Sequence, residues 1–218
     1  MRAATAYYLR LLLARQSALA PVLVFLSVVA MVYASAAGPA LPAGSVTAVA
    51  LMPTAAWLIR LVSGVESGTF AQVTLVALGS RRRRLAARVL ATGAVVAALS
   101  VVDVAWAVVA NPQPYPVGTI VALLALHLAE GAAGIGLGAL VSPPLSDRPG
   151  LAVTVVVGYC IVGLVTPWLP PLRPVLQALQ HDAETPVGVL LLVVLQALAF
   201  GVVCLGAALV LERRRARE

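Results

Sequence analysis

The chain contains no lysine and only eight acidic residues, and charged residues make up 11% of its 218 positions. Soluble domains carry about 25% charged residues, so this composition excludes an ordinary water-soluble fold. The absence of lysine also excludes a P-loop, because that loop uses a lysine to reach nucleotide phosphates. We therefore expect neither ATP hydrolysis nor lysine-based catalysis in this chain.

Residues for other familiar chemistries are also scarce. The two cysteines, Cys160 and Cys204, lie inside apolar runs and have no partners at metal-ligand spacing. The sequence has no G-x-S-x-G or H-E-x-x-H motif. We expect no metal, no cofactor and no enzymatic activity in this chain. An intramembrane enzyme stays an alternative, although no nucleophile and base are evident.

Hydrophobic sequence is abundant: 61% of residues are hydrophobic, and the mean hydropathy is +1.02. A transmembrane helix needs about 20 consecutive, mostly apolar residues. Six runs meet this requirement, separated by turn-forming residues at 38–42, 111–116 and 142–144. The predicted spans are 17–37, 45–65, 86–110, 117–141, 151–169 and 187–211. They predict an all-α membrane protein with six transmembrane helices, forming a single domain over residues 1–218.

The first span admits a second interpretation. Arg2, Arg10 and Arg15 precede an apolar run that ends at Ala34-Ser35-Ala36, as in a cleavable signal peptide. We expect this run to be the first span. Before it, residues 2–16 place alanine, tyrosine and leucine side chains on one helical face, which is typical of a helix lying flat on a membrane surface. A plain extension of the first span is the alternative.

The arginines predict the orientation. Net charge is +7, but the arginines lie between apolar spans and not on one face of a folded domain, so nucleic acid is not expected as a partner. Arg81 to Arg84 cannot enter hydrocarbon, where one arginine costs about 2.5–3.5 kcal/mol. Placing this run in water or among headgroups on the cytoplasmic side puts 14 of the 15 arginines there, and only Arg173 outside. Both termini are then cytoplasmic, in agreement with the positive-inside rule.

A second amphipathic segment is predicted after the fifth span. Leu172, Val175, Leu176 and Leu179 recur at helical spacing. We expect a short helix on the outer surface, or partly re-entrant, with Trp168 at the level of the headgroups.

Three ionisable residues fall inside predicted spans. His127 and Glu130 are three residues apart and share a helical face, and Asp103 lies in the third span, which we expect to place it near the outer end. Intramembrane ionisable groups are functional candidates, so a proton relay or a polar lining of a translocation path is one hypothesis. Hydrogen bonding between packed helices is the other.

Four glycines leave one side of the fourth span without side chains. Gly134 and Gly138 form a G-x-x-x-G pair, and Gly131 and Gly136 lie beside them. Such a pair lets another helix approach closely. We expect helix packing here, with a second subunit as one candidate neighbour.

Residues 60–88 join the second and third spans and are too apolar for a solvated loop. Phe70, Val73, Thr74 and Ala77 fall on one helical face, which predicts a short surface helix ending at Gly79 as a C-cap. The arginines that follow are predicted to bind headgroups or the acidic surface of a partner. Glu66 is predicted to pair with Arg60 or to meet that partner.

The chain resembles an ABC-2 type transporter permease, the membrane subunit of an ATP-binding-cassette exporter. Glu66-Ser67-Gly68-Thr69 matches the family's Glu-x-Gly-Thr motif after the second span, and Gly79-Ser80-Arg81 resembles its turn into the third span without the usual proline. The resemblance also covers the N-terminal amphipathic helix, six spans and a membrane-dipping segment before the last span. It implies a coupling helix that docks on an ATPase through seven residues: Glu66, Gly68, Thr69, Phe70, Val73, Arg81 and Arg82.

The resemblance further implies the partners. They are two separate ATPase subunits carrying ATP and Mg²⁺, and a second permease that is either a copy or a homologue, all at a bacterial cytoplasmic membrane. Export of an amphipathic or apolar substrate is expected. Two alternatives stay open: a proton-coupled secondary carrier using Asp103, His127 and Glu130, and a non-transporting anchor or immunity subunit.

Overall fold

The computed structural model describes residues 1–34, 40–66, 69–111, 114–143, 146–166, 171–172, 175–176 and 187–215. Within these ranges the chain is helical and contains no strand. The helices are α1 (Arg2–Leu13), the 3₁₀ turn η1 (Gln16–Ala18), α2 (Leu19–Ala34), α3 (Ala40–Ser63), α4 (Thr69–Leu78), α5 (Arg81–Ala110), α6 (Val117–Leu140), α7 (Pro149–Val165) and α9 (Val187–Arg215).

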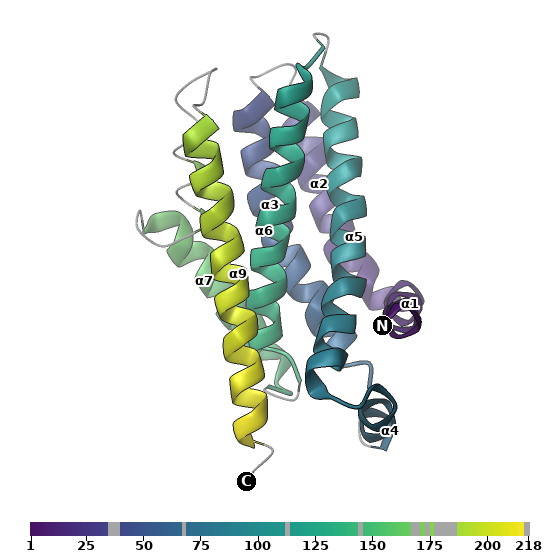
Figure 1. Ribbon diagram of the computed structural model, residues 1–218. Helices are drawn as coiled ribbons and strands as arrows, with labels where there is room; N and C mark the ends of the chain where they lie inside the picture. The colour runs from purple at the N-terminus through teal and green to yellow at the C-terminus, as the bar shows by residue number, and fades with distance from the viewer. Residues whose placement is uncertain are drawn as a thin grey trace.

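The long helices run roughly parallel or antiparallel to one another (Figure 1). α2 and α5 run in one direction, and α3, α6 and α9 run in the other. The short helices α1 and α4 lie outside the bundle, toward the end at which α9 finishes (Figure 1). We call this end the arginine end, because it holds the start of α5 and the end of α9.

Five helices are long and apolar enough to cross a membrane: α2 together with η1, α3, α5, α6 and α9. The structure is therefore that of a multi-pass helical membrane protein. The predicted count of six spans is not confirmed, because α7 has 17 residues and a length of about 25 Å. A bilayer core is about 30 Å thick. The chain still returns between α6 and α9, since these two helices run in the same direction (Figure 1).

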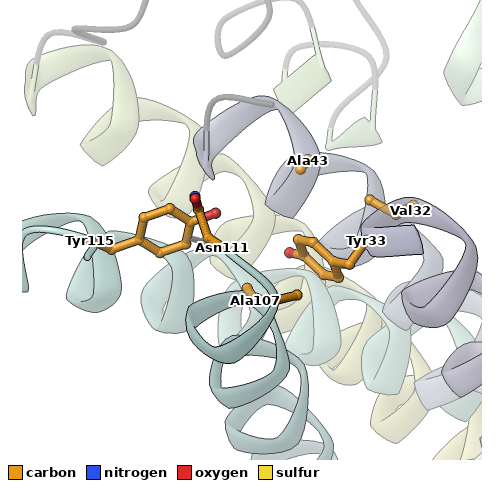
Figure 2. A pocket seen from close by; sticks show the side chains of 7 residues that line it. Val32, Tyr33, Ala43, Ala107, Asn111 and Tyr115 are labelled. Atoms are coloured by element: carbon orange, nitrogen blue, oxygen red, sulfur yellow. The ribbon is translucent and has the colours of Figure 1, made fainter. Parts of the chain in front are cut away.

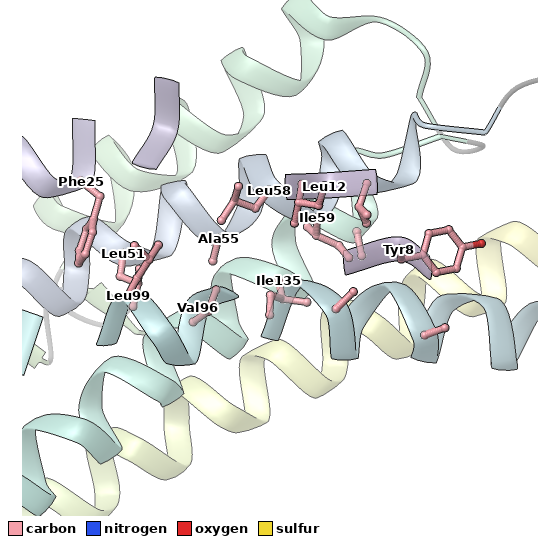
Figure 3. Packing of buried hydrophobic residues seen from close by; sticks show 14 of the residues in the cluster. Tyr8, Leu12, Phe25, Leu51, Ala55, Leu58, Ile59, Val96, Leu99 and Ile135 are labelled. Atoms are coloured by element: carbon pink, nitrogen blue, oxygen red, sulfur yellow. The ribbon is translucent and has the colours of Figure 1, made fainter. Parts of the chain in front are cut away.

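α3 and α6 form the centre of the bundle. About two thirds of the spanning window is buried in each of them, against 17% in α2 and 22% in α9. Residues of α3 and α6 occur in all three hydrophobic clusters of the interior. The largest cluster runs from Tyr8 and Leu12 of α1 through Leu58 and Ile59 to Leu99 (Figure 3). α2 and α9 therefore leave most of their surface on the outside of the bundle.

Two helices begin earlier than the membrane spans predicted within them. Residues 38–42 were expected to break the chain, but α3 begins at Ala40 and holds Pro42 in its first turn. Proline is tolerated there because the first N–H groups of a helix have no intrahelical partner. α5 begins at Arg81, before the predicted third span at 86–110, because the Ser80 hydroxyl caps it by accepting a bond from the Arg83 N–H at 3.2 Å.

Most of the predicted outer helix, including Arg173 and the segment 177–180, lies outside the described residues, as does Trp168. Within the described part, Leu172 and Val175 are fully buried and pack in two of the hydrophobic clusters. These two residues thus contribute to the interior of the bundle.

Candidate functional site

The predicted surface helix exists as α4, and its apolar side chains are exposed. Phe70, Val73 and Val76 are 75%, 61% and 82% exposed, and no residue of α4 is buried. Thr69 is exposed as well. We call the residues Thr69, Phe70, Val73 and Val76 the α4 surface. Apolar side chains gathered on a short, uncovered helix indicate a site of contact with a membrane surface or another protein.

Local sequence explains why α4 ends where it does. Gly79 has φ +71°, and its N–H donates to the carbonyls of Leu75 and Val76. Glycine adopts this left-handed conformation without the steric cost that a Cβ adds. The prediction of a helix capped at Gly79 is confirmed, and the sharp turn brings the chain directly into α5.

The four consecutive arginines have different environments. Arg82 and Arg83 are exposed, as expected, but Arg84 is buried and forms an ion pair of 2.7 Å with Glu212 of α9. Arg81 donates to the backbone carbonyl of Glu212 at 2.7 Å. The expectation that the whole run faces solvent or a partner was therefore wrong for Arg84. Successive helical residues point 100° apart, so one of them faces α9.

Glu66 also lies inside the protein. Its Oε2 accepts bonds from the Tyr8 hydroxyl at 2.9 Å and from Arg88 at 3.1 Å, and the Arg88 guanidinium lies 5.4 Å from the centre of the Tyr8 ring. We call Tyr8, Glu66 and Arg88 the Glu66 cluster. It ties α1 and the chain after α3 to α5.

The Glu66 cluster changes the acidity of Tyr8. Burial raises the pKa of Tyr8 to about 12, and the hydrogen bond to the Glu66 carboxylate acts in the same direction, while the positive charge of Arg88 opposes it. The phenol consequently stays protonated and donates to Glu66 throughout the physiological range.

Arg60 does not pair with Glu66. Its guanidinium donates to the backbone carbonyls of Val141 and, at 3.2 Å, Ser146. Arg60 therefore satisfies carbonyl groups just after α6, where the helix has ended and backbone partners are missing.

A second polar group lies deep in the bundle. His127 Nε2 lies 2.6 Å from Asp103 Oδ2, and the Thr47 hydroxyl lies 3.0 Å from each of them. His127 Nδ1 approaches the Leu123 carbonyl at 2.7 Å. We call Thr47, Asp103 and His127 the Asp103 cluster. All three residues are fully buried, and Asp103 lies in the second half of α5, toward the end of the bundle opposite the arginine end.

Glu130 does not join His127. It is fully buried, and neither of its carboxyl oxygens has a hydrogen-bond partner among the described residues. Tyr159 and Cys160 of α7 lie within range of its electrostatic field. His127 and Glu130 thus lie one turn apart on α6 but face different helices. His127 faces α5, and Glu130 lies on the side of α7.

A small pocket of about 20 Å³ opens where α2, α3, α5 and the start of α6 meet (Figure 2). Tyr33, Asn111 and Tyr115 line it. Tyr33 lies within electrostatic reach of both Tyr115 and Asp103. The pocket thus places hydroxyl and amide groups between the Asp103 cluster and the end of the bundle opposite the arginine end.

Gly134 and Gly138 provide close helix packing, with α3 of the same chain as their neighbour. A Cβ at Gly134 would collide with the backbone carbonyl of Met52, and one at Gly138 with that of Ala56. Gly136 meets the backbone of Gly201 in α9 in the same way. The glycine face of α6 is therefore filled within this subunit and is not open to a second one.

The sequence motifs predicted the position of α4 but not the residues that hold it and its neighbouring helices in place. Tyr8, Thr47, Arg84, Arg88 and Glu212 were not singled out as partners. Helical spacing shows which residues share a face, but not which helix packs on that face. Gly68 and Ser67 of the Glu-x-Gly-Thr motif lie outside the described residues. The described residues contain no cluster of three or more His, Cys, Asp or Glu side chains suited to a metal.

Comparisons of this chain with protein-family models, curated proteins and solved structures found no match.

Proposed function

We propose that this chain is the transmembrane subunit of an ABC exporter and that, with a second permease, it forms the path for an amphipathic or apolar substrate. A separate pair of ATPase subunits supplies the energy. The observation that carries the proposal is the α4 surface, which is apolar, uncovered and placed at the arginine end of the bundle. Docking on an ATPase would cover it, with Arg82 beside it to meet acidic residues.

The connections of α4 suit it to transmit force. The Glu66 cluster holds the chain before α4 against α1 and α5, and Arg84 at the start of α5 donates to the Ala71 carbonyl of α4 at 3.3 Å. A displacement of α4 would thus move the ends of α3 and α5 together. Glu66 and Arg81 act in this proposal by holding the helix in place, while Thr69, Phe70, Val73 and Arg82 make contact. Nucleotide can shift the transporter between two states only if docking differs between them.

The topology follows from the same proposal. The arginine end lies in the cytoplasm of a bacterial cell, in the inner membrane, with α1 flat on the inner leaflet. In this topology α7 belongs to the fifth of six crossings.

A photo-crosslinking amino acid at position 73 tests the docking. We expect the full chain, expressed in its source cells, to crosslink there to a protein that binds ATP, and the purified complex to hydrolyse MgATP. The same amino acid at Leu13, which is exposed on α1, serves as the control and should not capture that protein. Phe70→Ser with Val73→Ser should abolish assembly and stimulated hydrolysis, while Leu13→Ser should preserve both. Assembly that survives the double substitution would contradict the proposal.

A proton-coupled secondary carrier is the second candidate, and the Asp103 cluster favours it. A buried carboxylate and imidazole 2.6 Å apart can exchange a proton, and Asp103 Oδ1 has no partner among the described residues. In proteoliposomes without an ATPase, this function predicts proton uptake, followed by an internal pH dye. Asp103→Asn should remove it, and Asp147→Asn, at an exposed site, should not. An ABC subunit would show no such uptake.

A further inference from the structure

An apolar groove of about 480 Å³ opens on the side of the bundle between α2, α3 and α7. Val24 and Val28 of α2 form one wall, and Val153 and Val157 of α7 form the other. Pro53 and Trp57 of α3 lie between these walls. The volume lies within the range of about 300–1,000 Å³ that is typical of small-molecule sites.

The lining offers a ligand almost nothing but hydrocarbon contact. Thr54 is the one hydroxyl-bearing residue among the described lining residues, and its hydroxyl already donates to the Ala50 carbonyl at 3.2 Å. A polar ligand group would lose its hydrogen bonds to water here without replacement. The groove therefore fits a flexible hydrocarbon chain. Val24, at its edge, is mostly exposed on the membrane-facing surface, so such a chain can enter from the bilayer.

An arginine precedes each of the two helices that wall the groove, α2 and α7. α2 and α7 both begin at the arginine end, and an arginine precedes the first groove residue of each by five positions: Arg15 before Ala20, and Arg148 before Val153. Neither guanidinium forms an ion pair with the described residues. Asp147 directly precedes Arg148 in the sequence, and its negative charge interacts with Arg60. Each of the two helices that wall the groove is thus preceded by an arginine on the side of the arginine end.

We propose that this groove binds an acyl chain of an anionic phospholipid, with the phosphate held between Arg15 and Arg148. The two arginines complement the headgroup, and the lining complements the chain. Each arginine near an anionic membrane surface favours binding by about fivefold. This site does not depend on whether the subunit works with an ATPase.

Trp57 reports on the groove directly. The variant W106F/W168F leaves Trp57 as the single tryptophan in the chain. We expect brominated phosphatidylglycerol, diluted into phosphatidylcholine vesicles, to quench it at about 25-fold lower mole fraction than brominated phosphatidylcholine, a factor of about five for each of the two arginines. The matched control is W57F/W168F, which keeps only Trp106, an exposed residue of α5 outside the groove. Quenching of Trp106 should not depend on the headgroup.

Further variants in the single-Trp57 background test the headgroup site and the acyl-chain groove separately. R15Q/R148Q should abolish the preference for phosphatidylglycerol while leaving quenching by phosphatidylcholine. Val24→Phe should weaken quenching by both lipids, because it fills the groove, whereas Leu23→Phe, at an equally exposed neighbour outside the groove, should not.

Three results would overturn the proposal. Equal quenching by both lipids at Trp57 would make the groove an ordinary lipid contact. Preference unchanged in R15Q/R148Q would remove the headgroup site. Absence of quenching together with a dimeric mass in light scattering would assign the groove to a second copy of the chain.

Discussion

Arginines 82 and 83 are exposed, while Arg84 and Arg88 are buried in ion pairs with Glu212 and Glu66. A buried guanidinium loses its hydration and must recover the cost from a carboxylate at short distance. Both acidic partners lie on segments far away in the sequence. At the scale of single residues, the arginine end is therefore fastened by two charge pairs and not only by its attraction to headgroups.

The Glu66 cluster makes the first prediction. Glu66→Gln leaves Arg88 buried without its charged partner, so we expect a loss of about 3–5 kcal/mol in the free energy of unfolding. Chemical denaturation in detergent micelles measures it. E66Q/R88M should recover most of the loss, and Arg82→Gln, at an exposed site, should stay within about 0.5 kcal/mol of the parent. A single variant as stable as the parent would show that the pair contributes nothing.

Tyr8 makes the second prediction, on pH. Burial raises its pKa from 10.0 to about 12, so the folded chain holds the phenolic proton more tightly than the unfolded chain does. Its contribution to stability is therefore complete below pH 10 and is lost as the pH rises toward 12. Difference absorbance of the folded protein should show one phenol fewer titrating above pH 10 in Tyr8→Phe. Titration of that phenol below pH 10 would contradict the buried contact.

At the scale of elements, the turn between α4 and α5 depends on one glycine. Gly79→Ala forces an L-residue into the left-handed region at φ +71°, which costs about 1–2 kcal/mol. Hydrogen exchange of α4 amides should accelerate while the other helices keep their protection. Gly93→Ala in α5, where a Cβ meets open space, is the matched control and should stabilise by about 0.5–1 kcal/mol. Unchanged α4 exchange in Gly79→Ala would refute the role of the cap.

The contact between α3 and α6 depends on glycines of α6. Gly134→Ala places a methyl group against the Met52 carbonyl, so the helices must separate, and we expect destabilisation of about 1–3 kcal/mol. Thermal unfolding in micelles measures this loss. Gly118→Ala, on the same helix with open space around it, should be neutral or slightly stabilising. Equal melting temperatures for the two variants would mean that this contact is looser than described.

At the scale of the whole molecule, α4 and the ends of α3 and α9 gather at one end of the bundle, and the turn between α5 and α6 lies at the other (Figure 1). In a background with Cys160 and Cys204 replaced by alanine, cysteines at Arg82 and Pro114 should label from opposite faces of the membrane. An impermeant maleimide applied to intact cells should reach Pro114→Cys, and Arg82→Cys only after lysis. Labelling of both in intact cells would refute this orientation.

Much of the architecture could be predicted from particular residues. Gly79 predicted the end of α4, and Gly134 and Gly138 predicted a close helix contact. The effect of a missing Cβ is local, so it can be inferred without the tertiary structure. Helical spacing predicted a surface helix with Phe70 and Val73 on one face, together with Thr74 and Ala77. The α4 surface shares Phe70 and Val73 with that face and adds Thr69 and Val76. The sequence favoured His127 with Glu130, however, and the bundle joins His127 to Asp103 instead.

The sequence by itself determined that this is a helical protein rich in membrane-spanning segments, because hydrophobic length and the position of arginines are properties of the chain alone. Only the tertiary structure decided which charges are buried, which helix fills the glycine face of α6, and that α7 is short while an apolar groove opens beside it. The physical reason is that the partner of a side chain depends on how helices rotate and pack against one another. That arrangement minimises the energy of the whole bundle, and no single segment specifies it.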